Sequence, residues 1–159
     1  MQRKKVLFFS DSSDTVGFCR RILGKGYELV NVAMEQDGVS GVRQYAPDLV
    51  IIDLEVGSER GFWLCRELSG DGTTGDTPVM VLFDRDDRET AERALALGAA
   101  DFSSKPIIPA LFAKRAQTTI ERFSKRLPRC PRCQRQMRPE WSFCPFDGSG
   151  LRISNSAKE

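Results

Sequence analysis

Residues 47–54 read Pro47-Asp48-Leu49-Val50-Ile51-Ile52-Asp53-Leu54, in which the apolar run 49–52 is followed directly by a carboxylate, Asp53. A short continuous run of Leu, Val and Ile predicts a β-strand that is buried on both faces. Burial of an unpaired carboxylate is strongly unfavourable, so Asp53 requires a cationic partner, a metal ion or a place at the hydrated end of the strand. This stretch therefore predicts both a parallel sheet and a functional position at its edge.

Further runs of the same kind alternate with helical patterns through residue 125. The runs predict strands over residues 6–9, 27–32, 79–82 and, more weakly, 101–103. Amphipathic periodicity predicts helices over residues 15–23, 36–45, 61–68, 89–97 and 108–123. In the last helix we expect Leu111, Phe112, Ile120 and Phe123 to face the core. The alternation predicts an α/β fold in which helices cover both faces of a parallel sheet.

Charged residues follow four of the predicted strands. They are Asp11, Asp53, Asp84 and Lys105, in chain order. Ligands of open α/β sheets bind at the carboxyl ends of the strands, so we expect these side chains to converge on one edge. The alternative is that each of them is a solvated loop charge.

Four segments together resemble the receiver domain of bacterial response regulators. They read VLFFSDSSD at 6–14, LVIIDLEVGSERG at 49–61, PVMVLF at 78–83 and GAADFSSKP at 98–106. The resemblance covers residues 4 to about 125. It implies a flavodoxin-like, doubly wound five-stranded parallel sheet of strand order 2-1-3-4-5, with residues 1–125 as the receiver domain and 126–159 as a separate tail.

The resemblance also implies a phosphorylation site. In that family the carboxylate that ends the third strand, here Asp53, accepts a phosphoryl group from a histidine kinase. Mg²⁺ would be held by Asp11, Asp53 and the backbone carbonyl of Glu55, and Lys105 would pair with the phosphoryl oxygens.

The chain departs from the family pattern after the first strand, where Ser10 stands in place of one of two usual acids, and at the end of the fourth strand. Phe83 stands where the family has a Ser or Thr hydroxyl, and Asp84 stands where it has a small residue. A phenyl ring cannot donate a hydrogen bond to phosphate, and a carboxylate repels a dianion. The usual coupling between that hydroxyl and an aromatic residue, here Phe102, cannot operate. We favour an atypical receiver that works without phosphorylation, in which Asp53 pairs with Lys105 for structure alone. The alternative is a conventional acceptor at Asp53.

The tail carries two short cysteine motifs, CPRC at 130–133 and CPFDG at 144–148. The chain has no histidine, so Cys130, Cys133 and Cys144 are its candidate zinc ligands, in an arrangement typical of a small zinc ribbon. Asp147 either is the fourth ligand or caps its own turn. We expect Trp141 and Phe143 to pack over the metal. The alternative is an unfolded tail with incidental cysteines.

Composition indicates a globular protein, with 40% hydrophobic and 29% charged residues among 159 and a net charge of +2. No apolar run is long enough to span a bilayer, and the N-terminus lacks a signal-peptide core, so we expect a cytoplasmic protein with no membrane partner. A pocket without histidine, without a nucleophile–base pair and without a phosphate-binding glycine loop disfavours an enzyme that acts on an outside substrate.

A basic repeat in the tail raises the question of nucleic acid. Arginine recurs at every third position, at Arg126, Arg129, Arg132, Arg135 and Arg138. A solvated positive face is the preferred interpretation, and a nucleic-acid or acidic protein partner is the alternative. We expect a protein partner in a signalling pathway. A histidine kinase and a second copy of the chain remain open as partners.

Overall fold

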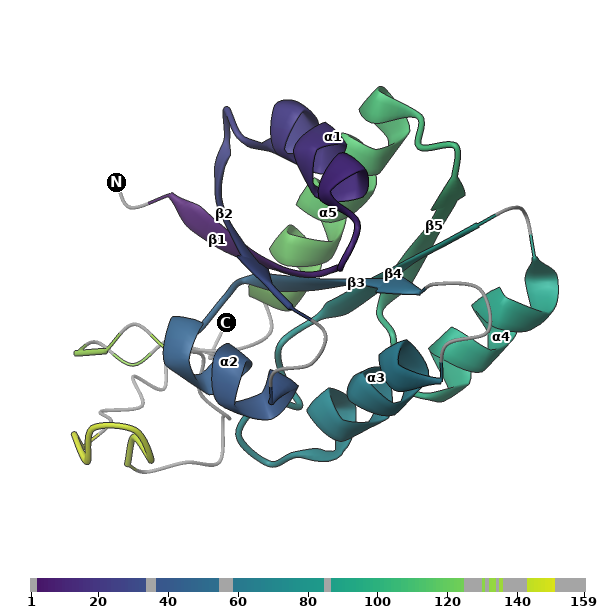
Figure 1. Ribbon diagram of the computed structural model, residues 1–159. Coiled ribbons are helices and arrows are strands. Elements are labelled where there is room, and N and C mark those ends of the chain that lie inside the picture. Colours follow the sequence, from purple (N-terminus) through teal and green to yellow (C-terminus); the bar gives the residue numbers. More distant parts are fainter. Residues whose placement is uncertain are drawn as a thin grey trace, which may run out of the picture.

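The computed structural model describes residues 3–33, 37–54, 59–84, 87–124, 130, 132–133, 135 and 143–150. Its centre is a five-stranded, fully parallel sheet with the order β2-β1-β3-β4-β5, which confirms the expected topology (Figure 1). The strands are β1 (Lys4–Phe9), β2 (Tyr27–Val32), β3 (Leu49–Leu54), β4 (Val79–Asp84) and β5 (Asp101–Lys105).

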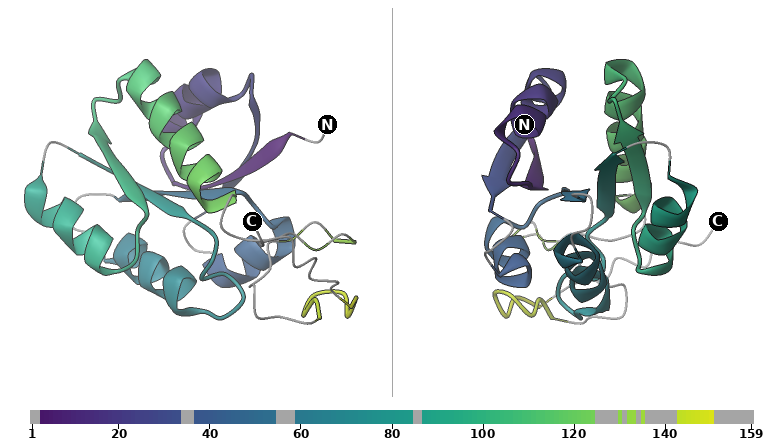
Figure 2. Two further views of the ribbon diagram at one scale, coloured as in Figure 1. Left: turned by 180° about the vertical axis from the view of Figure 1, so that it is seen from behind. Right: turned by 45° about the vertical axis from the view of Figure 1, so that its right-hand side comes forward.

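Helices follow the strands and cover both faces of the sheet. They are α1 (Ser13–Leu23), α2 (Gly38–Tyr45), α3 (Arg60–Gly70), α4 (Arg88–Ala96) and α5 (Pro109–Ser124). Helices α1 and α5 pack on one face, and α2, α3 and α4 pack on the other, as the views from behind and from the side also show (Figure 2). Within the residues that the structure describes, no helix combines the length and hydropathy needed to cross a membrane.

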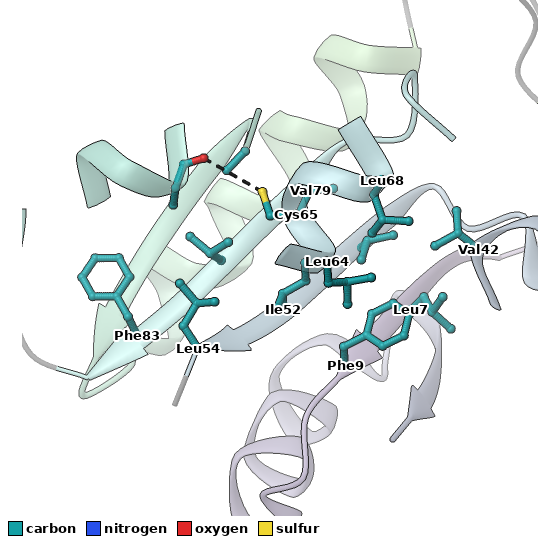
Figure 3. Packing of buried hydrophobic residues seen from close by; sticks show 14 of the residues in the cluster. Leu7, Phe9, Val42, Ile52, Leu54, Leu64, Cys65, Leu68, Val79 and Phe83 are labelled. Carbon is teal, nitrogen blue, oxygen red and sulfur yellow. Dashed lines mark hydrogen bonds between the residues drawn. The ribbon is translucent and has the colours of Figure 1, made fainter. Parts of the chain in front are cut away.

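The core consists of two apolar layers that the sheet separates. Every residue of β3 is buried, as its continuous apolar run predicts. Successive β3 side chains point to opposite faces, so Ile51 belongs to the layer under α1 and α5. Ile52 belongs to the other layer, with Leu64 and Leu68 of α3 (Figure 3). The two layers hold β3 at the centre of the fold, and its polar residue, Asp53, lies buried near the carboxyl end of the strand.

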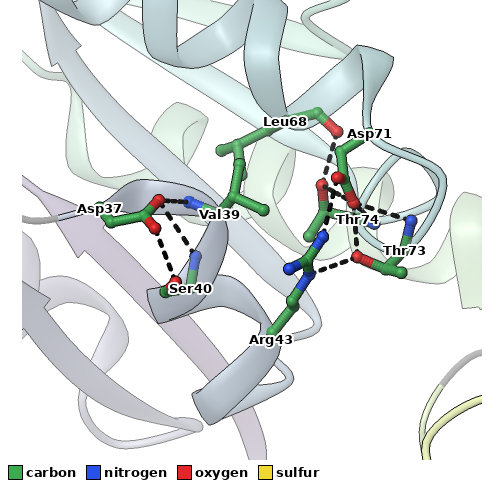
Figure 4. Close-up of polar contacts among 8 residues, drawn as sticks. All are labelled: Asp37, Val39, Ser40, Arg43, Leu68, Asp71, Thr73 and Thr74. Carbon is green, nitrogen blue, oxygen red and sulfur yellow. Dashed lines mark hydrogen bonds and ion pairs between the residues drawn. The ribbon is translucent and has the colours of Figure 1, made fainter.

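Local polar contacts fix the ends of the elements. Asp37 caps α2 by accepting from the backbone of Val39 and Ser40. Further along the chain, Arg43 donates to Asp71 at 2.9 Å and to the Thr73 hydroxyl at 2.7 Å, which ties α2 to the loop after α3 (Figure 4).

The predicted elements are present with shifted ends. The strands β3, β4 and β5 extend two residues further than the apolar runs, because parallel pairing continues to Leu54, Asp84 and Lys105. One predicted core residue is wrong: Leu111 is exposed, and Ala116 occupies the core beside Phe112 instead. Helix α5 ends at Ser124, so the predicted boundary between 125 and 126 lies outside the described residues.

Candidate functional site

Parallel register brings the charged residues to one edge of the sheet. Phe9 pairs with Ile52, so Ser10 lies beside Asp53 just after β1 ends. In the same way Asp84 pairs with Lys105 across β4 and β5. Residues that are more than forty positions apart therefore meet because three strands end together.

Asp53 is buried and both of its carboxylate oxygens have a donor from the chain itself. Lys105 Nζ donates to Oδ1 at 2.8 Å, and the Ser10 hydroxyl donates to Oδ2 at 2.8 Å. The Asp53 side chain is 1% exposed, whereas Lys105 is 23% exposed. The carboxylate is thus neutralised and hydrogen-bonded, which is what a charge at this depth requires.

Lys105 also forms an ion pair with a second carboxylate. Asp84 Oδ1 lies 3.6 Å from Nζ, on the exposed side of the ammonium group. Burial alone would lower the pKa of Lys105, but the hydrogen bond and charge of Asp53, with a smaller contribution from Asp84, raise that pKa above its ordinary value. Lys105 therefore stays charged and is shared between two acids.

The magnesium ligands expected from the resemblance are placed only in part. Asp11 follows β1 at the same edge as Asp53 and is exposed, while Glu55 lies outside the described residues. Carboxylate oxygens of Asp11 and Asp53 suit a hard divalent cation. Each oxygen of Asp53 already accepts one hydrogen bond, so a cation bound there would share an oxygen with Ser10 or Lys105 or displace one of them.

Phe83 and Phe102 form an aromatic pair beside this site. Phe83 is buried, and its ring centroid lies 5.8 Å from that of Phe102. The guanidinium of Arg115 on α5 stacks over Phe102 at 5.6 Å and donates to Asp101 at 2.8 Å. Phe102 is consequently held between β4 and α5.

Sequence reasoning missed two contacts, one with Asp53 and one between α4 and the start of α3. The Ser10 donation could have been inferred, since a hydroxyl residue at a strand end adjacent to Asp53 has a buried acceptor within reach. The second, which we call the Arg93 clasp, joins α4 to the start of α3: Arg93 pairs with Glu59 through two hydrogen bonds and stacks over the Phe62 ring at 4.0 Å. No periodic signal marks that contact.

The tail residues form a second cluster. Cys130, Cys133, Cys144 and Asp147 each offer one ligand atom, and these atoms all lie within 4.8 Å of one another. Sγ of Cys133 and Sγ of Cys144 are 3.5 Å apart, and all five cysteines are free thiols. The predicted ligands are therefore brought together.

The two cysteine motifs are closed by backbone hydrogen bonds. Cys130 N–H donates to the Arg135 carbonyl, and Cys144 N–H donates to the Ser149 carbonyl, both at 2.8 Å. The prediction that Phe143 packs over the metal site is wrong: its side chain is 68% exposed, and Phe146 packs against the cysteines instead. Trp141 lies outside the described residues.

Within the basic repeat, the described arginines are Arg132 and Arg135. Arg132 is exposed, whereas Arg135 stacks over Phe146 at 4.4 Å. Arg126, Arg129 and Arg138 lie outside the described residues. A continuous basic surface therefore stays a prediction.

The isolated cysteines are buried, as predicted, and are not part of either cluster. Burial raises the pKa of Cys19 to about 12 and that of Cys65 to about 11. Both side chains are fully covered by neighbouring elements, and Cys65 Sγ lies against the carbonyls of Ala94 and Leu97. They are protonated apolar residues at neutral pH.

Comparison with known proteins shows the family to which most of the chain is similar. The family model for the response regulator receiver domain matches residues 6–117. PleD, a response regulator of Caulobacter vibrioides, is 32% identical over 106 residues, which cover 65% of this chain and 23% of PleD. "Probable transcriptional regulator ycf27" of Porphyridium aerugineum is 28% identical over 130 residues, covering 79% of this chain and 51% of ycf27.

A solved structure agrees with these relatives. The signal receiver domain of a signal transduction histidine kinase from Syntrophus aciditrophicus has 29% identity and a TM-score of 0.61, and the match covers 74% of this chain and 90% of that domain. The chain spans about half of ycf27 and under a quarter of PleD. Fold, edge geometry and family match agree, and the chain belongs to the response regulator receiver domain family.

Proposed function

We propose that this receiver acts in signal transduction through protein contacts and does not depend on phosphorylation of Asp53. The observation that carries the proposal is the closed carboxylate: both Asp53 oxygens accept hydrogen bonds from Ser10 and Lys105. A phosphoryl group bonded to either oxygen would compete with the donor on that oxygen and weaken or replace its hydrogen bond. Each replacement removes a satisfied contact from a buried charge, which is unfavourable.

The surroundings of Asp53 support the same proposal. Phe83 offers no hydroxyl to a phosphoryl oxygen, and the Asp84 carboxylate already pairs with Lys105. In a phosphorylated state, Asp84 would add a like charge beside the dianion. When bound, Mg²⁺ would supply charge neutralisation, with Asp11 and Asp53 as its ligands among the described residues. Those two acids and Lys105 are the features that favour the conventional alternative.

Intact-mass analysis after incubation with acetyl phosphate and Mg²⁺ tests the proposal. We expect no phosphoryl adduct on the wild-type chain. A triple variant, Ser10→Asp, Phe83→Thr and Asp84→Ala, restores the family's residues and serves as the matched control that should gain one adduct. A wild-type adduct that disappears in Asp53→Ala would overturn the proposal.

A cellular assay extends the test to output. An Asp53→Asn variant keeps one acceptor oxygen for Lys105 and presents an NH₂ group that can donate to the Ser10 hydroxyl oxygen, but it cannot take a phosphoryl group in the usual way. If signalling proceeds by protein contact alone, the variant should support the pathway at the wild-type level. Loss of output from a variant with unchanged thermal stability would contradict the proposal.

The tail is proposed as a zinc-bearing contact module. The mutual approach of Cys130, Cys133 and Cys144 supports it, since three cysteine sulfurs at such separations can bind one ion as thiolates. So short a segment cannot bury enough apolar surface to fold alone, and metal binding would supply the stability. Elemental analysis of protein purified without chelators should give about one zinc per chain. Absence of metal would refute the module.

The second candidate function combines a conventional phosphoacceptor with a tail that binds nucleic acid. Exposed Arg132 beside the cluster is the observation in its favour. Fluorescence anisotropy with labelled DNA and RNA at two salt concentrations tests it, because phosphate contacts are strongest at low salt. Lack of binding at low salt would eliminate this candidate.

A further inference from the structure

The two roles considered for Asp147, as a zinc ligand or as a cap of its own turn, are carried by different oxygens of one carboxylate. Oδ1 accepts from the Ser149 backbone N–H at 2.8 Å and from the Ser149 hydroxyl. Oδ2 lies 3.4 Å from Cys130 Sγ. The cap therefore leaves Oδ2 directed at the thiols, which is the orientation that a ligand needs.

Two separations within the cluster match those around a tetrahedral ion. Zinc bonds of about 2.3 Å to sulfur and about 2.0 Å to oxygen give tetrahedron edges of about 3.8 Å between two sulfurs and about 3.5 Å between sulfur and oxygen. The structure has 3.5 Å between the sulfurs of Cys133 and Cys144, and 3.4 Å between Cys130 Sγ and Asp147 Oδ2. A disulfide sulfur pair would be about 2.05 Å apart. These spacings fit a shared ion rather than a bridge.

Ser149 contacts both halves of the site. Its hydroxyl donates to Asp147 Oδ1 and lies 3.2 Å from Cys130 Sγ, while its carbonyl accepts from Cys144 N–H at 2.8 Å. A metal ligand that is held by a neighbouring hydrogen bond has its orientation fixed before the ion arrives. Ser149 is the residue of the described tail that holds the carboxylate in this way.

We infer that the tail binds a tetrahedral divalent ion, Zn²⁺ or Co²⁺, through three thiolates and Asp147 Oδ2, and that Ser149 is the positioning residue of this S₃O centre. This inference rests on the proposed zinc-bearing tail and assigns the fourth ligand within it. Three thiolates and one carboxylate leave the centre with a net charge of −2. Arg132, whose backbone N–H donates to Cys130 Sγ at 3.4 Å, and Arg135 lie next to that charge.

Cobalt substitution of the full chain counts the thiolates. The sulfur-to-cobalt charge-transfer band grows with the number of bound thiolates, so Asp147→Cys should strengthen it by about a third, from three thiolates to four. Cys133→Ala should weaken it by about a third. Cys65→Ala, which removes a buried thiol of the receiver, should leave the band unchanged and is the matched control.

Zinc competition with a chromophoric chelator measures the positioning role. We expect Ser149→Ala to weaken Zn²⁺ binding about 10- to 100-fold, as loss of a supporting hydrogen bond does in other zinc sites, and Ser149→Thr to restore it. Asp147→Ala should weaken binding at least as much. Far-UV circular dichroism of each variant should match the wild type, because the receiver does not depend on these residues.

The outcomes separate this inference from the module on which it rests. If the wild-type chain binds neither Co²⁺ nor Zn²⁺, both fail. If it binds them but Asp147→Ala and Asp147→Cys change neither affinity nor band, the module stands and the S₃O assignment fails. If the Asp147 variants behave as expected while Ser149→Ala binds like wild type, Ser149 is not a positioning residue.

Discussion

Replacing Lys105 with methionine removes one partner of the buried Asp53 carboxylate and keeps most of the volume of the side chain. Asp53 Oδ1 then loses its donor, and Ser10 remains on Oδ2 alone. Breaking a buried ion pair costs about 3–5 kcal/mol. Since Lys105 is 23% exposed and Asp53 is 1% exposed, we place the loss at the low end of that range, about 3 kcal/mol.

Urea unfolding followed by far-UV circular dichroism in magnesium-free buffer measures this loss. With a denaturant slope of about 2 kcal/mol per molar, 3 kcal/mol corresponds to a midpoint lower by about 1.5 M. The control is Lys114→Met on the exposed side of α5, which should shift stability by less than about 0.5 kcal/mol.

A double variant completes the thermodynamic cycle. Asp53→Asn in the Lys105→Met background removes the stranded charge, so it should recover most of the lost stability, with a coupling energy of about 2 kcal/mol or more. A loss under about 1 kcal/mol in Lys105→Met, or the absence of coupling, would refute the argument that the pair neutralises a buried carboxylate.

Three further predictions concern the scaffold around the site. The hydroxyl of Thr73 and, with a smaller effect, Arg43 lower the pKa of Asp71. This carboxylate therefore stabilises the fold above a pH of about 4, and its contribution is lost as the pH falls through the lowered pKa. Asp71→Asn should reduce the pH dependence of the melting temperature in that acidic range. Gly98 has φ of +102°, and an added Cβ would meet Ser69 Oγ at 2.4 Å, so Gly98→Ala should lower the free energy of unfolding in urea by more than about 1 kcal/mol. Gly17 has open space around it in α1, so Gly17→Ala should raise that free energy by about 0.5–1 kcal/mol. Equal effects of the two variants would contradict this reasoning. Thr74 is buried and its hydroxyl donates to the Leu68 carbonyl at 2.8 Å, so Thr74→Val should lower the free energy of unfolding measured by calorimetry by about 1–3 kcal/mol. An unchanged free energy of unfolding would mean that the Leu68 carbonyl finds another donor.

The fold and the edge site could be predicted because both depend on regular patterns. A continuous apolar strand such as β3 and charges placed directly after strands determine which residues meet when parallel strands end together. The Arg93 clasp could not be predicted in this way, since two long side chains on different helices can meet in many arrangements.

The two wrong burial predictions have simple geometric causes. The core-facing stripe of α5 runs through Phe112, Ala116 and Ile120, and Leu111, about 100° away from Phe112, lies outside that stripe. Neighbouring residues of an extended segment point to opposite sides. With Cys144 directed into the cluster, Phe143 is directed to solvent.

The Arg93 clasp has a consequence for recognition. By joining α4 to the start of α3, it restricts the side chains of Glu59, Phe62 and Arg93 before any other molecule arrives. Ordering a rotamer-rich side chain on association costs about 0.5–1.5 kcal/mol, and part of this cost is met within the fold. A protein that docks across α3 and α4 would thus lose less conformational entropy there than on a surface of unrestrained arginine and glutamate.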